Sequence, residues 1–141
     1  MRNLEWFLPI LQGIFLGLLA MTLHEVAHLL TARLVGIRVK KVGLRWKGLY
    51  TVRDPGSPRD NAIVSLAGPL LNLALLLMWH WSPTFGLANL CFFGFNVLPI
   101  EGSDGERVWK CWLQAQKQTQ AQEMASIAVR RFHLRAGEFT D

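Results

Sequence analysis

The 141-residue chain is 51% hydrophobic and only 18% charged, and its formal net charge is +5. Soluble domains carry about 25% charged residues, so this composition argues against an ordinary soluble domain and favours a membrane protein. The excess of positive charge requires no nucleic-acid partner, because basic loops beside apolar segments are typical of membrane topology and of attraction to anionic lipid.

The first predicted element is an apolar helix that begins near residue 7. Residues 7–23 contain no charged side chain, and with their flanks they are long enough to cross a bilayer, which takes roughly 20 helical residues. A cleaved signal peptide is the alternative interpretation. The helical pattern nevertheless continues without a break through HEVAHLLTARL, and only Arg2 is basic in the segment that precedes it. We therefore expect a membrane span.

A basic loop follows this span. Residues 33–59 hold eight basic side chains: Arg33, Arg38, Lys40, Lys41, Arg45, Lys47, Arg53 and Arg59. Two short alternating stretches within the loop predict a small β-hairpin, and Ser57-Pro58 is typical of a helix start. The positive-inside rule places this loop in the cytoplasm, with the N-terminus outside and the C-terminus inside. We expect a prokaryotic inner membrane.

Two more apolar runs, 62–81 and 83–100, are separated only by Ser82 and predict a tight hairpin of two helices. The expected fold is therefore an all-α integral membrane protein with three transmembrane helices, the small hairpin after the first of them, and an amphipathic helical tail. We divide it into a membrane-embedded core, residues 1–108, and a cytoplasmic or interfacial tail, residues 109–141. Pro99, Gly102 and Gly105 predict broken backbone after the third run, which is tolerated at membrane depth where it lines a cavity.

The stretch HEVAH places His24, Glu25 and His28 inside the first apolar segment. Residues four apart share one face of a helix, so both histidines can bind one metal ion. This is the HExxH arrangement, in which two histidines hold zinc and the glutamate acts as general base. The alternative is a set of polar residues that face a helix bundle, but ionisable groups inside a membrane are costly unless they are paired or functional.

Catalytic zinc usually has three protein ligands and one open position, so a third ligand is needed. His80 falls near the opposite end of the second span, Asp54 and Asp60 lie in the basic loop, and His133 in the tail stays open as an option. Asp104 is better placed, because it follows the third span where the chain returns to the cytoplasmic side.

Three separated stretches, HEVAH, SLAGPLLN at 65–72 and NVLPIEGSDGERV at 96–108, together resemble the site-2 protease family of intramembrane zinc metalloproteases. The resemblance covers roughly residues 13–108. It implies that Asp104 is the third zinc ligand, that Asn72 lies near the metal, and that Asn96 helps to hold an extended substrate strand. Helix–helix hydrogen bonding is the simpler role for both asparagines. Glu106 stands where the family usually has a second glycine.

The predicted function is that of a zinc-dependent intramembrane endopeptidase that cleaves transmembrane or membrane-proximal segments of substrate proteins. Its expected partners are transmembrane protein substrates and the lipid bilayer; no nucleic acid is expected, and a homo-oligomer is kept open. One alternative is a non-proteolytic membrane protein that retains a structural metal site and binds transmembrane partners. Another is a membrane-anchored peptidase that acts on soluble peptides.

Overall fold

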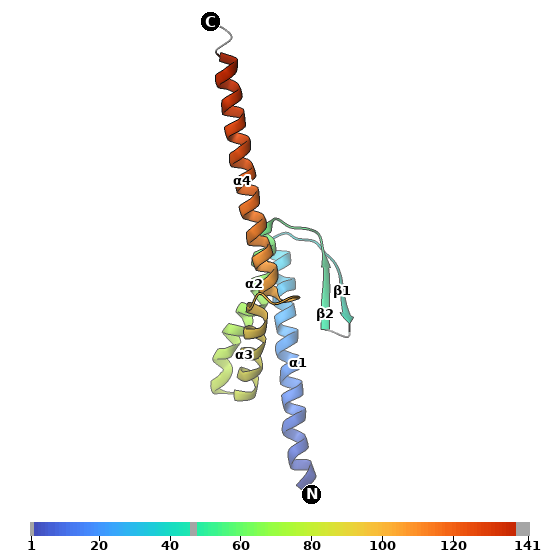
Figure 1. Ribbon diagram of the computed structural model, residues 1–141. Coiled ribbons are helices and arrows are strands. Elements are labelled where there is room, and N and C mark those ends of the chain that lie inside the picture. The colour runs from blue at the N-terminus through green and yellow to red at the C-terminus, as the bar shows by residue number, and fades with distance from the viewer. Residues whose placement is uncertain (1, 46–47, 138–141) are drawn as a thin grey trace.

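The computed structural model describes residues 2–45 and 48–137 as a bundle of helices with one small hairpin (Figure 1). Helix α1 runs along one side, α2 and α3 lie together beside it, and α4 extends away from the bundle toward the C-terminus. In chain order the elements are α1 (Arg2–Leu34), β1 (Val39–Arg45), β2 (Gly48–Arg53), α2 (Pro58–Leu75), the 3₁₀ turn η1 (Leu76–His80), α3 (Pro83–Val97) and α4 (Asp104–Gly137).

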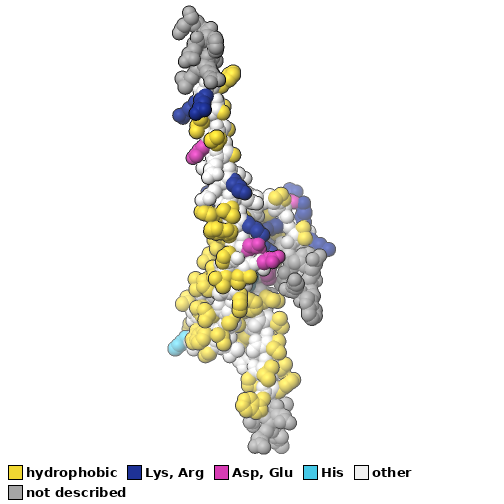
Figure 2. Space-filling view, in the orientation of Figure 1, with side chains coloured by type: hydrophobic (Ala, Val, Ile, Leu, Met, Phe, Trp, Pro, Cys, Tyr) yellow, Lys and Arg dark blue, Asp and Glu magenta, His cyan; other side chains and the backbone are white. Residues whose placement is uncertain are grey.

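The outer surface of the helical bundle is strongly apolar. Trp6, Ile10 and Phe15 on α1 expose 60% or more of their surface, and apolar side chains cover the visible face of α1, α2 and α3 (Figure 2). The charged side chains on that face gather at the hairpin and along α4. Within the described residues, two helical segments are long and apolar enough to cross a membrane, Trp6–Leu34 and Pro58–His80. This distribution is consistent with a membrane protein.

The predicted hairpin is confirmed. Strands β1 and β2 pair antiparallel, with Val39 opposite Arg53 and Val42 opposite Thr51. The backbone N–H of Asp54 then donates to the Arg38 carbonyl at 3.0 Å. In this way the hairpin returns the chain to the end of α1 from which it left, and β2 lies within reach of the site described below.

The predicted helix start at Ser57-Pro58 is also confirmed. Ser57 caps α2, and its Oγ accepts a hydrogen bond from the Asp60 N–H at 3.1 Å. In the turn between η1 and α3, Ser82 caps α3, and its Oγ accepts a hydrogen bond from the Phe85 N–H at 3.4 Å. Serine at these positions satisfies backbone donors that a helix start leaves without an intrahelical partner.

The third predicted span is shorter than expected. Helix α3 has 15 residues and ends at Val97, so residues 98–100 of the apolar run are not helical. The cause is local: Leu98 precedes Pro99 and has extended backbone angles, φ −70° and ψ 142°, because the proline ring disfavours a helical conformation in the residue before it. Three spans are thus not confirmed, and in the part of the chain that the structure describes two helical segments are long and apolar enough to cross a membrane.

Gly105 does not interrupt a helix, contrary to the prediction from the sequence. It is the second residue of α4, which continues without interruption to Gly137. The division into a core and a tail at residues 108 and 109 falls within this helix and stays a prediction. A Cβ at Gly105 would lie 2.6 Å from the Leu98 carbonyl oxygen and still closer to that of Val97. Glycine therefore lets the first turn of α4 pack directly on the end of α3. The positive φ of 87° at Gly102 makes the turn between the two helices.

Candidate metal centre

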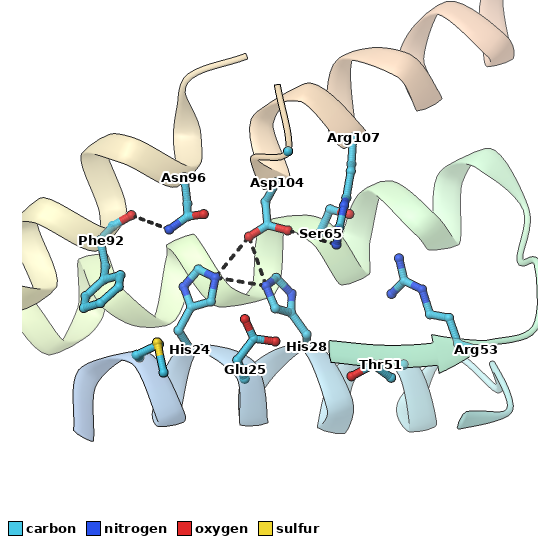
Figure 3. Close-up of a pocket in the computed structure, with 13 residues that line it drawn as sticks. His24, Glu25, His28, Thr51, Arg53, Ser65, Phe92, Asn96, Asp104 and Arg107 are labelled. Carbon is cyan, nitrogen blue, oxygen red and sulfur yellow. Dashed lines mark hydrogen bonds and ion pairs between the residues drawn. The ribbon is translucent and has the colours of Figure 1, made fainter. Parts of the chain in front are cut away.

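Three of the predicted site residues meet at one point, although they come from opposite ends of the chain. His24 and His28 lie on α1, and Asp104 is the first residue of α4 (Figure 3). Each histidine Nε2 is 3.0 Å from Asp104 Oδ2, and the two Nε2 atoms are 3.1 Å apart. His24 and Asp104 are buried, and the His28 side chain exposes 12% of its surface.

The partners of the other ring nitrogens determine what faces this point. His24 Nδ1 donates to Asn72 Oδ1 at 2.5 Å, and His28 Nδ1 donates to the Val64 carbonyl at 2.6 Å. In a neutral imidazole with Nδ1 protonated, Nε2 carries a lone pair. Two nitrogen lone pairs and one carboxylate oxygen therefore converge in a buried place, and such a cluster of acceptors requires a cation or a proton between them.

The donor set fits zinc. Two imidazole nitrogens and one carboxylate oxygen are ligands that zinc accepts, with bonds of about 2.0–2.2 Å. The edges of a tetrahedron with such bonds are about 3.3 Å, close to the 3.0–3.1 Å that separate the three atoms here. Among the described residues, His24, His28 and Asp104 are the cluster of three possible ligands that the geometry brings together.

Asp104 is prepared to carry a negative charge. Burial alone would raise the pKa of its carboxyl, but the close contacts of Asp104 with the His24 and His28 rings outweigh burial and hold the pKa well below its usual range. The guanidinium of Arg107, one turn along α4, lies 3.6 Å from the other carboxylate oxygen, Oδ1. Asp104 is therefore ionised at neutral pH, as a metal ligand must be.

Gly68 on α2 leaves the space in which the histidine nitrogens meet. A Cβ built there would lie 2.5 Å from His28 Nε2 and 2.6 Å from His24 Nε2, too close for any real contact. The glycine of SLAGPLLN is thus explained by close approach of the α2 backbone to the site. A methyl group at this position would overlap both histidine rings, so glycine is what lets α2 pack this close to them.

We expect Gly68→Ala to abolish stoichiometric zinc binding, because the new methyl group would displace both Nε2 atoms. The measurement is the zinc content of the purified protein by mass spectrometry. Gly94→Ala on α3 is the matched control, since a Cβ there meets nothing within 4 Å, and it should bind zinc as the wild type does. Equal zinc content in both variants would contradict the proposed position of the ion.

A chain of buried amides holds His24 in its orientation. Asn72 Nδ2 donates to Asn89 Oδ1 at 2.8 Å, and Asn89 Nδ2 donates to the Phe85 carbonyl at 2.9 Å. Both asparagines are 0% exposed. The backbone carbonyl of α3 therefore fixes the orientation of Asn89, which fixes that of Asn72, which in turn fixes the ring of His24. Asn72 lies next to His24, at the position that the resemblance implied. The sequence analysis did not assign a role to Asn89, although a polar amide within the apolar run 83–100 could have indicated one.

Replacing Asn89 with alanine should weaken zinc binding by about tenfold, because partners behind the first ligands typically contribute 10–100-fold to metal affinity. Competition with a zinc chelator measures the affinity. Asn96→Ala is the control: its Nδ2 donates to the Phe92 carbonyl within α3, so zinc affinity should stay at the wild-type value. A larger loss in the control than in Asn89→Ala would argue against the chain of amides.

The three convergent groups line a cavity of about 430 Å³. Glu25 also lines it, and its carboxylate points into the cavity beside the two histidines (Figure 3). Asn96 of α3 also lines the cavity, as do two basic residues, Arg53 of β2 and Arg107 of α4. The structure thus brings His24, His28 and Asp104 to one point, places Glu25 and Asn96 on the cavity lining, and places Asn72 against His24, while the roles of these residues stay predictions.

Glu106, which departs from the family glycine, has a structural role at the start of α4. Its Oε2 accepts from the Gly102 N–H at 2.9 Å and its Oε1 lies 2.6 Å from Lys110 Nζ. Its own N–H donates to Ser103 Oγ at 3.1 Å. These contacts form a cap much like a capping box, and they lower the pKa of Glu106, chiefly through the hydrogen bond with Lys110.

The other ionisable residues that were considered lie elsewhere. Asp54 forms an ion pair with Lys40, and Asp60 accepts a hydrogen bond from Ser57 Oγ at 2.6 Å. His80 is exposed at the end of η1, and Glu101 is exposed in the turn before α4. The side chain of His133 lies outside the described part of the chain.

Comparison with known proteins gives two relatives, both from Methanocaldococcus jannaschii. MJ0611, whose name proposes it to be a zinc metalloprotease, is 37% identical over 76 residues, which cover 44% of this chain and 40% of the relative. The zinc metalloprotease MJ0392 is 26% identical over 108 residues, or 67% of this chain and 32% of the relative. The chain is related to these metalloproteases. It spans about a third to two fifths of their length, and no family model matches it.

Proposed function

We propose that the protein is a zinc-dependent intramembrane endopeptidase of the site-2 protease type. The observation that carries the proposal is the convergence of His24 Nε2, His28 Nε2 and Asp104 Oδ2 in a cavity that Glu25 also lines. A site with three protein ligands leaves a position for water or substrate, which distinguishes catalytic from structural zinc. The relation to zinc metalloproteases supports the same chemistry.

Each residue of the site has a part in peptide hydrolysis. Bound zinc would supply a Lewis acid that polarises the scissile carbonyl and lowers the pKa of water. Glu25 accepts a proton at its carboxylate from the attacking water and delivers it to the amine nitrogen of the leaving peptide. Asn72 keeps His24 in the tautomer that presents Nε2 to the cavity. Asn96, on the cavity wall, offers its amide to the backbone of an extended substrate.

The substrate that fits this placement is a transmembrane segment. The exposed apolar surface of α1 and α2 suits contact with lipid. In a membrane, a single-span protein could then approach the bundle from the side. A helical segment hides its carbonyls, and it must unwind before hydrolysis; an unwound stretch can pair with the hairpin or lie across Asn96. The basic hairpin is then cytoplasmic, with the N-terminus of α1 on the opposite side.

Cleavage of synthetic single-span peptides in detergent or liposomes tests this function. With zinc present, the protein should cut them, and mass spectrometry of the products should place the cut inside the apolar span. Cuts that fall only outside the span, or in soluble peptides alone, would support a membrane-anchored peptidase instead. An absence of any cleavage by zinc-loaded protein would overturn the proposal and favour the non-proteolytic role.

A further inference from the structure

A second cavity adjoins the metal site. It has a volume of about 380 Å³ and shares Ser65, Asn96 and Asp104 with the first cavity. The rest of its lining is apolar or backbone from α2, the end of α3 and the first turns of α4: Leu66, Pro69, Val97, Pro99, Gly105, Val108, Trp109 and Trp112. Pockets of a few hundred cubic ångströms are large enough to enclose small organic groups.

The tryptophans form a flat wall of this cavity. Trp109 and Trp112 stack with ring centroids 4.9 Å apart and an interplanar angle of 30°. Each is about half exposed, so this wall of the cavity reaches the surface of the protein. An aromatic wall of this kind favours contact with another aromatic ring or with a branched aliphatic side chain.

Ser65 lies on the boundary between the two cavities and has no partner. Its residue is 1% exposed, and its Oγ is buried without a hydrogen bond to any described residue. A serine inside a helix commonly bonds back to the carbonyl one turn earlier, and Ser65 does not. Buried hydroxyl groups are costly when unpaired. Ser65 lines both cavities, so a group bound there would supply the partner that this hydroxyl lacks among the described residues.

We propose that the second cavity binds a large aliphatic or aromatic side chain of the substrate next to the scissile bond, while Ser65 Oγ–H donates to the substrate backbone. The inference rests on the proposed function and adds its side-chain preference. Asp104 and Ser65 line both cavities, so a single substrate residue bound beside Asp104 can contact Ser65 with its backbone and the tryptophans with its side chain.

A substrate fits this site better than a lipid acyl chain does. The lining combines three polar residues, Ser65, Asn96 and Asp104, with a larger number of apolar ones. An acyl chain has no donor or acceptor with which to satisfy Ser65 Oγ. An amino-acid residue has both an apolar side chain and a polar backbone, in the order that the site requires.

Two sets of single-span peptides test the preference, with Ala, Leu or Phe placed either directly before or directly after the cleaved bond. In one of the two sets, the wild type should cleave the Leu and Phe peptides at least about tenfold more efficiently than the Ala peptide, the usual effect of filling an apolar subsite. Val108→Phe, which fills the cavity, should bring that ratio close to one. Leu113→Phe, on the same helix but outside the lining, should keep it. Ser65→Ala should lower kcat/KM for all three peptides alike.

Cross-linking gives a readout that does not need cleavage. A photoreactive phenylalanine is placed in the peptide at whichever of the two positions shows the preference. Bound to the zinc-loaded Glu25→Gln variant, this peptide should cross-link to residues 108–112 of α4. If the wild type cleaves the peptides but Val108→Phe leaves the ratio unchanged, the subsite is wrong and the peptidase stands. If no peptide is cleaved but the cross-link forms on α4, the binding site stands and the peptidase is wrong. Cross-links elsewhere overturn the subsite.

Discussion

Replacing Glu25 with glutamine should reduce peptide cleavage by about 10²–10⁴-fold, the usual contribution of a general acid–base group. Glutamine has nearly the same size but cannot accept the proton of the attacking water at the cavity that Glu25 lines. The two histidines and Asp104 are unchanged in this variant, so it should retain one zinc ion per chain. Rates of peptide cleavage and zinc content, measured on the same preparation, test both halves of the expectation.

Glu101→Gln is the matched control for this experiment. Glu101 lies shortly before Asp104 in the sequence, does not line the metal cavity, and is exposed in the turn between α3 and α4. Its replacement should leave both the cleavage rate and the zinc content at wild-type values. If Glu25→Gln cleaves peptides as fast as the wild type does, Glu25 is not the general base.

Replacing Asp104 with alanine should weaken zinc binding by more than the roughly 10–100-fold that follows from loss of an outer-shell partner. The variant removes the oxygen that lies 3.0 Å from both histidine Nε2 atoms and leaves two ligands. We expect little or no zinc after purification and no cleavage. Isothermal titration with zinc, followed by a cleavage assay at saturating zinc, measures the two effects separately.

Asp54→Ala provides the comparison, because Asp54 belongs to an ion pair with Lys40 on the hairpin and does not line the metal cavity. It should bind zinc with wild-type affinity. Full zinc occupancy in Asp104→Ala would show that the third ligand is another residue, and His133 would then be the first one to replace.

Local sequence rules predicted much of the fold because the relevant forces are local. The cap at Ser57, the antiparallel pairing of residues 39–53 and the tight turn before Pro83 all follow from neighbouring residues. The end of α3 was predicted less well. The apolar run continues to Ile100, but the backbone restriction that Pro99 imposes on Leu98 stops the helix earlier than hydrophobicity suggests.

The sequence predicted only those site residues that belong to recognisable motifs. The spacing of His24 and His28 follows from the helical repeat, and the resemblance indicated that Asp104 and Asn72 lie near them. Asn89 and Ser65 were not identified, because their significance depends on what α3 and the two cavities bring beside them. Glu106 looked like a departure from the family, and its role as a cap depends on the positive-φ turn at Gly102.

The long separation of the ligands along the chain has a thermodynamic consequence. His28 and Asp104 are 76 residues apart, so a bound ion would close a loop that contains the hairpin and both helices of the α2–α3 pair. By the chain-entropy argument used for disulfides, a cross-link over a loop of that length removes about 4–5 kcal/mol of freedom from the unfolded chain. Zinc would then act as a reversible cross-link between α1 and the start of α4. Removal of zinc by a chelator would release the first turn of α4 from α1. Amide exchange near Asp104 should accelerate before exchange elsewhere in the bundle.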